Sequence, residues 1–97
     1  MIKHVVCFKL KDNSQDAKEK ATNVLMGMIT NVPQIWGMEV GQDILGSPRS
    51  YDLILQVVVE SKEKLEEYQN NEYHVNVVKK YMHAHVESSI SVDYEID

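Results

Sequence analysis

Two segments of this chain carry apolar residues on both faces of a β-strand, and this pattern constrains the fold more than any other feature. In residues 2–11, Val5 and Cys7 point opposite to Val6 and Phe8. In residues 51–60, a run rich in β-branched residues, Ile54 and Val58 point opposite to Leu53, Leu55, Val57 and Val59. A strand that is apolar on both faces belongs at the centre of a sheet that is covered on both sides. The fold therefore has to supply two covers for one sheet.

Two further strands and two helices are predicted around these central strands. A helix capped by Ser14 or Asn13 is expected to reach about Thr30, because apolar residues recur there at spacings of three and four. Residues 35–45 form a strand weakened by glycines. A second helix begins after Ser61, breaks at residues 70–71 and resumes to about Met82.

The final strand is predicted at residues 85–96, where apolar and polar residues alternate. One side carries Glu87, Ser89, Ser91, Asp93 and Glu95, and the other carries Val86, Ile90, Val92, Tyr94 and Ile96. The element order is thus β-α-β-β-α-β, typical of an α+β, ferredoxin-like fold. An antiparallel sheet in the order 4-1-3-2 places the two doubly apolar strands at its centre.

The two helices can cover only one face of such a sheet. A second copy of the chain supplies the other cover most simply, by packing its sheet against the first. We therefore predict one domain, residues 1–97, that forms a homodimer in which two sheets face each other as an α/β barrel. The alternative is a monomer whose second face is partly wet, which antiparallel sheets tolerate.

Composition excludes several classes of function. No stretch approaches the roughly 20 apolar residues that cross a bilayer, so no membrane partner is expected. The net charge of −5 argues against binding to nucleic acid, which needs clustered Lys and Arg. The N-terminal segment lacks the pattern of a secretory signal, and the cytoplasm is the expected location. Cys7, the only cysteine, is interpreted as a buried packing residue rather than a nucleophile.

Histidines are the side chains best suited to acid–base chemistry near neutral pH, and the chain has four. His4 lies within the first strand, on the same face as Val6 and Phe8, where it is expected to be buried or to line a pocket. His83 and His85 leave the second helix and are expected to be exposed, and their spacing alone does not predict a metal site. His74 follows Tyr68 across the helix break and is the better candidate for a site.

Three short motifs resemble the stress-responsive dimeric α/β-barrel (Dabb) family. They are residues 2–6 in the first strand, Tyr68 with His74 and Val75 in the second helix, and residues 92–94 in the last strand. The resemblance extends over essentially the whole chain. The family's helix pattern has two histidines separated by a proline, whereas this chain has Asn71 and Glu72 in place of the first histidine and the proline.

The resemblance implies a site. One plant branch of the family cyclises a polyketide by an aldol reaction without a cofactor, using residues that match Tyr68 and His74. His74 would remove an α-proton, the Tyr68 hydroxyl would hydrogen-bond the carbonyl oxygen, and Asp93 would orient an imidazole and stabilise its charged form. The pocket between sheet and helices would be lined by His4, Val6, Phe8, Met26 and Leu55.

Three functional hypotheses follow. The first is a homodimer whose apolar pocket binds a small hydrophobic or carbonyl compound, and the second is a cofactor-independent cyclase or isomerase of a carbonyl or polyketide substrate. The third is a purely structural assembly module, in which His4, Tyr68, His74 and Asp93 form a hydrogen-bonded brace. No cofactor is predicted. A few relatives hold a cation on backbone carbonyls after the first helix, corresponding to residues 32–38, but no metal is predicted here.

Overall fold

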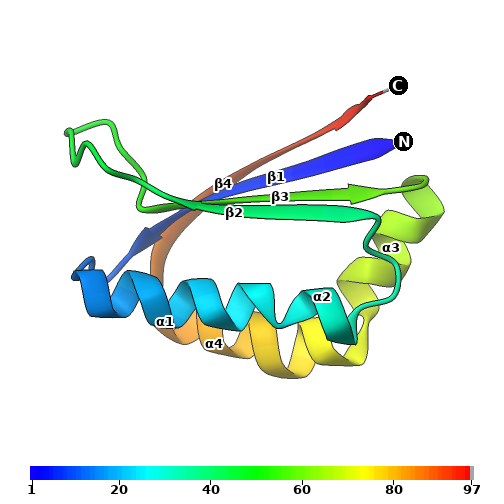
Figure 1. Cartoon of the computed structure of the whole chain (residues 1–97), viewed down its shortest axis with the longest axis horizontal. Coiled ribbons are helices and arrows are strands. Elements are labelled where there is room, and N and C mark those ends of the chain that lie inside the picture. The colour runs from blue at the N-terminus through cyan, green and yellow to red at the C-terminus, as the bar shows by residue number, and fades with distance from the viewer. Residues whose placement is uncertain (97) are drawn as a thin grey trace.

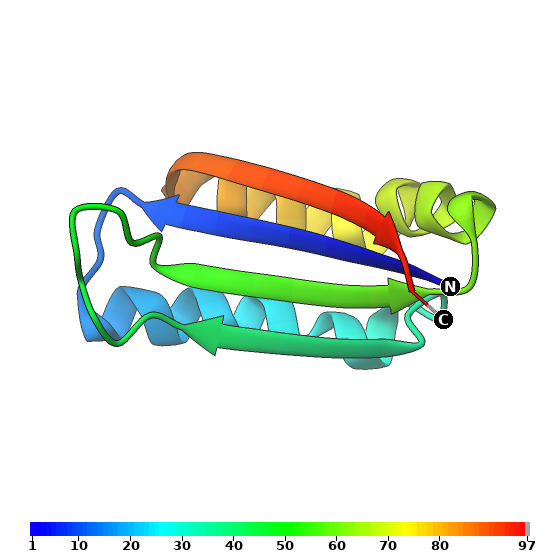
Figure 2. The ribbon, with the colours of Figure 1, turned by 90° about the horizontal axis from the view of Figure 1, so that it is seen from above.

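A four-stranded antiparallel sheet lies over a layer of helices in the computed structural model of the chain, which describes residues 1–96 (Figure 1). All helices lie on one face of the sheet, as the view from above in Figure 2 also shows. The elements are β1 (Ile2–Leu10), α1 (Gln15–Met26), α2 (Met28–Asn31), β2 (Gly37–Gln42), β3 (Leu53–Val59), α3 (Lys62–Asn70), the π-helix η1 (His74–Lys79), α4 (Lys80–His85) and β4 (Val86–Glu95).

The strands follow the order β2-β3-β1-β4, which confirms the predicted order 4-1-3-2 and the ferredoxin-like fold. The central strands β1 and β3 pair antiparallel from Ile2 with Val59 to Phe8 with Leu53. In β3, buried residues that face the helices alternate with half-buried residues that face away from them. The sheet therefore has one covered face and one face without a cover in the single chain.

Serine side chains fix where both long helices begin. The hydroxyl of Ser14 accepts a hydrogen bond from the amide of Ala17 at 3.2 Å, and that of Ser61 accepts one from Lys64 at 3.2 Å. The second helix is split as predicted, because α3 ends at Asn70 and η1 begins at His74. A glycine, Gly27, separates α1 from α2, and a Cβ atom there would collide with the hydroxyl of Tyr73.

The second strand is shorter than predicted and ends at Gln42 rather than Leu45. The carboxylate of Asp43 accepts a hydrogen bond from the amide of Gly46 at 2.7 Å, which turns the chain out of the sheet. Gly46 has a φ of 65°, a conformation that glycine adopts readily. Ile44 and Leu45 consequently lie exposed in the loop between β2 and β3.

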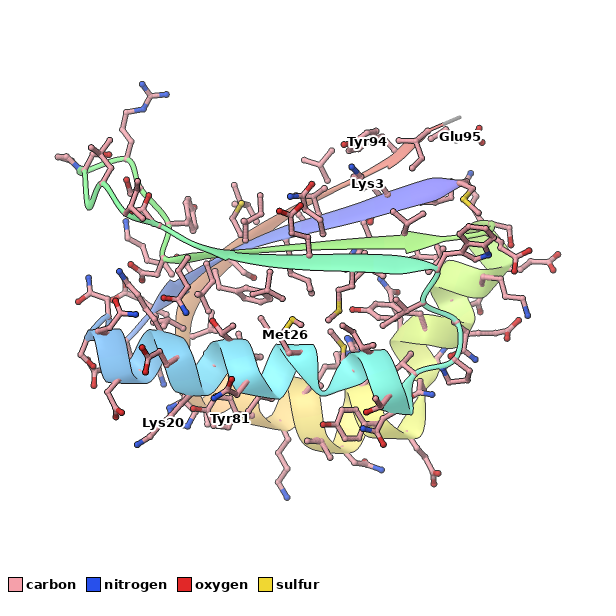
Figure 3. The ribbon with its side chains drawn as sticks, in the orientation of Figure 1. Lys3, Lys20, Met26, Tyr81, Tyr94 and Glu95 are labelled. Atoms are coloured by element: carbon pink, nitrogen blue, oxygen red, sulfur yellow. The ribbon has the colours of Figure 1, made fainter. Side chains whose placement is uncertain are left out.

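Strand β4 turns its polar side toward the helices and its apolar side away from them. His4 pairs with Asp93, whereas Lys3 pairs with Tyr94, and Figure 3 shows Lys3 and Tyr94 on the face away from the helices. Val86 was predicted on the same side as Tyr94, and this was wrong. The register shifts between Lys9 and Leu10, so Val86 pairs with Leu10 and packs against the core.

The core fills the layer between the sheet and the helices. Its most completely buried side chains come from α1, α2, β3 and α3, and they are Leu25, Met28, Val57, Val59 and Tyr68. Burial of such side chains stabilises a fold by about 1.5–3 kcal/mol each. No helix within residues 1–96 has the length and apolar composition needed to cross a membrane.

Candidate functional site

A cavity of about 310 Å³ lies between the helices and the helix-facing side of β1 and β4. Six of the residues predicted to form the site line it: His4, Val6, Phe8, Leu55, Tyr68 and His74. The structure adds seven residues that the sequence analysis did not single out for it: Leu25, Gln69, Val78, Lys79, Met82, Ser89 and Ser91. The wall therefore combines apolar side chains with a comparable number of polar ones, which can orient a bound molecule.

His4 is held by Asp93 across the β1–β4 pair. The two residues are direct neighbours in the register, and Nδ1 of His4 hydrogen-bonds Oδ1 of Asp93. His4 is buried, whereas the side chain of Asp93 is 40% exposed. The imidazole that Asp93 orients is thus that of His4, and Asp93 itself stands behind His4 and does not line the cavity.

Tyr68 of α3 lies between the two histidines and is fully buried. Its ring centroid is 5.6 Å from that of His4, in an edge arrangement, and 4.6 Å from that of His74. Burial raises the pKa of its hydroxyl, which therefore stays protonated. The hydroxyl donates to Sδ of Met28 at 3.7 Å, and Met28 does not line the cavity. In this conformation the Tyr68 hydroxyl is engaged outside the cavity.

His74 is placed by the break between α3 and η1. The side-chain oxygen of Asn71 accepts hydrogen bonds from the amides of Tyr73 at 2.9 Å and His74 at 3.2 Å, which starts the new helical segment. Nδ1 of His74 lies 3.2 Å from the carbonyl oxygen of Gln69. Because a carbonyl oxygen can only accept, Nδ1 carries the proton and Nε2 of the neutral ring is an acceptor.

The electrostatics of His74 favour this neutral form. Burial lowers the pKa of its imidazole, and the positive charge of Lys79 lowers it further, against the opposing effect of the hydrogen bond to Gln69. A neutral imidazole with an available Nε2 can accept a hydrogen bond or a proton from a molecule in the cavity. Proton removal by His74, which the family resemblance implies, requires this neutral form.

Met26 does not line the cavity, and its predicted place there was wrong. It is 41% exposed, whereas its neighbour Leu25 is fully buried and lines the cavity instead. Successive residues of an α-helix point in directions about 100° apart, so the core-facing stripe of α1 includes Ala21 and Leu25 but not Met26. Figure 3 labels Met26 on α1.

A wider groove of about 700 Å³ adjoins the cavity along η1, α4 and the start of β4. The two hollows share four lining residues, Phe8, Lys79, Met82 and Ser89. Ser89 of β4 and Lys79 line both hollows and therefore lie where the cavity and the groove meet. A ligand can therefore enter the cavity from the edge of the sheet.

Cys7 faces away from the helices and is only half-buried in the single chain, so the prediction of a buried packing residue was wrong for this state. It lines a smaller hollow of about 240 Å³ with Gly41, Tyr51 and Ile54. The reason is its odd place in β1, since the even positions from Ile2 to Leu10 face the helices. The outer face of the sheet thus keeps its apolar groups accessible.

His83 and His85 lie in the last helical turn, where both are exposed as predicted. The ring of His85 stacks on Tyr81 with centroids 4.2 Å apart. Within residues 1–96, no three side chains of His, Cys, Asp or Glu gather in a way that could hold a metal ion.

The fold and the site define a ferredoxin-like α+β domain with a histidine-lined cavity under its helices that opens toward the adjoining groove. The family model described as Stress responsive A/B Barrel Domain, or Dabb, matches residues 2–96, and the chain belongs to this family. The resemblance in the three sequence motifs is thereby confirmed. A search among curated proteins found no match.

Solved structures share the whole architecture. A dimeric protein of unknown function with a ferredoxin-like fold from Bacteroides fragilis is 25% identical, with a TM-score of 0.79, and 98% of this chain and 95% of that chain are covered. An Arabidopsis thaliana protein is 22% identical, with a TM-score of 0.85 and coverage of 100% and 96%. Hydroxynitrile lyase from Passiflora edulis is 14% identical, with a TM-score of 0.82 and coverage of 99% and 93%.

Proposed function

We propose that this chain is a homodimeric A/B barrel protein that binds a small, largely apolar molecule in the cavity beneath its helices. The observation that carries the proposal is the cavity of about 310 Å³ that reaches both His4 and His74. Such a volume lies near the lower end of the range for ligand sites, roughly 300–1,000 Å³. A ligand of one ring with a short chain fits this size class.

Dimer formation is supported by the outer face of the sheet. Its apolar residues on β4 are well exposed in the single chain: Ile90 is 53%, Val92 is 61% and Tyr94 is 45% exposed. Val5, Cys7 and Ile54 extend the same face over the central strands. A contiguous apolar face of this kind marks a protein–protein contact, and the Bacteroides fragilis relative is described as dimeric.

The purely structural hypothesis predicts a filled space between the two histidines and the sheet. Against it, none of the hydrogen bonds within residues 1–96 joins His74 to His4 or Asp93, and Nδ1 of His74 bonds the main chain at Gln69. The brace is limited to the bond between His4 and Asp93 and the rings packed on Tyr68. The cavity beside them favours ligand binding.

Isothermal titration calorimetry with 4-butylphenol tests the proposal. The Ser91→Phe substitution introduces a ring into the cavity from the exposed edge strand, and we expect it to weaken binding at least about tenfold. Ser88→Phe is the matched control, because Ser88 lies on the same strand and lines the groove but not the cavity. Equal weakening by both variants, or no binding to the unmodified protein, contradicts the proposal.

A second candidate function is cofactor-free enolisation of a carbonyl compound, and the state of His74 favours it. Its Nε2 accepts an α-proton, and the electron pair of the broken C–H bond moves to the carbonyl oxygen, giving an enolate. The lowered pKa of His74 keeps this base neutral at pH 7. The Tyr68 hydroxyl is not placed to donate to the enolate oxygen in this conformation. It donates to Met28 and must rotate to reach a substrate.

Exchange of α-protons tests this second candidate without knowledge of the product. In deuterated buffer, the protein is expected to accelerate deuterium incorporation into 4-phenylbutan-2-one, followed by NMR, and His74→Gln is expected to abolish the acceleration. His83→Gln, on the exposed end of α4, serves as the control. An unchanged rate in His74→Gln, or no acceleration by the unmodified protein, leaves the cavity as a binding site only.

A further inference from the structure

Lys79 is the one permanently charged side chain among the residues that line the cavity within residues 1–96. The ion pairs found in this range join His4 with Asp93, Lys20 with Asp16 and Lys64 with Glu67, so none of them engages Lys79. The side chain also lines the adjoining groove, which places it at the entrance between the two hollows. Its charge is available to a ligand.

The π-helix brings Lys79 to the same side of the chain as His74. The two are the first and last residues of η1, five positions apart. In an α-helix, residues five apart point in clearly different directions, whereas the i to i+5 hydrogen bonds of a π-helix stack them one turn above the other. The effect of the Lys79 charge on the His74 imidazole agrees with this proximity. Short π-helical segments occur frequently at functional sites.

Further hydrogen-bond donors line the same cavity, and one of them, Ser89, shares its mouth with Lys79. The hydroxyls of Ser89 and Ser91 line it from β4, opposite the helices. No carboxylate lines the cavity among residues 1–96, since Asp93 stands behind His4. The deeper wall is apolar and includes Leu25, Leu55 and Val78. The site thus has Lys79 and the Ser89 hydroxyl at its mouth, the Ser91 hydroxyl further along β4, and apolar core residues deeper inside.

We propose that the ligand of this cavity is an amphipathic anion, a small apolar body that ends in a single carboxylate or comparable acidic group held by Lys79. The inference rests on the proposed function, since it names the chemical class that the same cavity takes. The anionic end lies at the mouth between Lys79 and the serines of β4, and the apolar body lies against the core residues. Because the whole chain carries a net charge of −5, the local positive charge of Lys79 is what selects an anionic ligand.

Two probes of equal shape separate the charge from the shape of the ligand. They are 4-butylbenzoate and the neutral 4-butylbenzamide, titrated by calorimetry at low salt into the unmodified protein, Lys79→Met and Lys80→Met. Methionine keeps the apolar stem and removes the charge. Lys80 is the matched control, because it is adjacent and lines the groove but not the cavity.

The benzoate is expected to bind roughly fivefold to tenfold more tightly than the benzamide. Lys79→Met is expected to remove this preference and leave the affinity for the benzamide unchanged, whereas Lys80→Met retains the preference. Added salt is expected to weaken only the benzoate.

Three results overturn the inference. Equal affinity of the two probes for the unmodified protein contradicts the anionic ligand but leaves the cavity as a binding site. A preference that persists in Lys79→Met shows that another group recognises the charge. Absence of binding by both probes contradicts the proposed function together with the inference.

Discussion

His74 owes its chemical state to one main-chain contact and to its partial burial. The carbonyl of Gln69 fixes the proton on Nδ1, and burial lowers the pKa of the ring. The ring therefore presents an acceptor to the cavity at neutral pH, whether the bound molecule donates a hydrogen bond or a proton. The hydrogen bond from His4 to Asp93 fixes the second imidazole independently.

The lowered pKa of His74 predicts a pH-dependent contribution to stability. The unfolded chain binds a proton near pH 6.5, whereas the folded chain resists it, so stability is present above about pH 6.5 and is lost as the pH falls through the folded pKa. We expect the free energy of unfolding to fall less in His74→Gln than in the unmodified protein between about pH 7.5 and about pH 5. Urea unfolding at both pH values measures this difference, and equal losses in the two proteins contradict it.

Several site residues could be predicted from the sequence, because the alternation of side chains along a strand determines which of them share a face. His4, Val6 and Phe8 share a face of β1 by position alone, and they share the cavity. Lys79 could not be predicted, since its place depends on a π-helical turn that has no clear sequence signal. Met26 was misplaced because it lies outside the core-facing stripe of α1, which its neighbour Leu25 occupies.

The π-helix η1 is the element that assembles the helical wall of the cavity. It presents His74, Val78 and Lys79 to the same hollow, and its neighbours α3 and α4 add Tyr68, Gln69 and Met82. A π-helical turn accommodates one more residue than an α-helical turn over the same length of axis. The chain on both sides keeps its helical phase.

Deletion of Asn76 tests this interpretation of η1. Asn76 is exposed, and without it the segment is expected to form a continuous α-helix that keeps His74 and Lys79 four residues apart on one face. We expect thermal stability to be at least equal and the affinity for 4-butylbenzoate to change by no more than about twofold. Deletion of buried Val78 is the destabilising control. Unfolding on deletion of Asn76 contradicts the account.

The sequence predicted the four strands and the two helical regions, but not all of their limits, nor the break at Gly27 between α1 and α2, nor the π-helical form of η1. Caps at Ser14 and Ser61 are local signals and were identified correctly. The end of β2 was misjudged because apolar Ile44 and Leu45 continue the strand pattern, whereas the turn at Asp43 is decided by a side-chain hydrogen bond. The bulge before Leu10 likewise has no signature in the alternation of β4.

In the whole molecule, the polar side of β4 lines the cavity, and its apolar side is available to a second sheet. The serines face the helices and line the cavity, and Ile90, Val92 and Tyr94 face outward, where a second sheet is expected. The proposed binding site and the expected dimer contact thus lie on opposite faces of the same strand. The cytoplasmic location remains a prediction from the sequence.

Light scattering after size-exclusion chromatography tests the dimer. The chain of 11.2 kDa is expected to migrate as a species of twice this mass. Val92→Asp is expected to shift it to the monomer, because a charge buried between two apolar sheets lacks a partner. Val77→Asp is the control, since Val77 is similarly exposed on the helical side. A monomeric unmodified protein, or dissociation by both substitutions, argues against the outer face as the contact.

The position of a bound molecule shows whether the cavity beneath the helices is the binding site. Intermolecular NOE measurements on the protein saturated with 4-butylphenol locate the butyl chain among the methyl groups. The account predicts contacts with Leu25, Leu55 and Val78, inside the cavity between sheet and helices. Contacts confined to the outer face, at Ile90 and Val92, would contradict it.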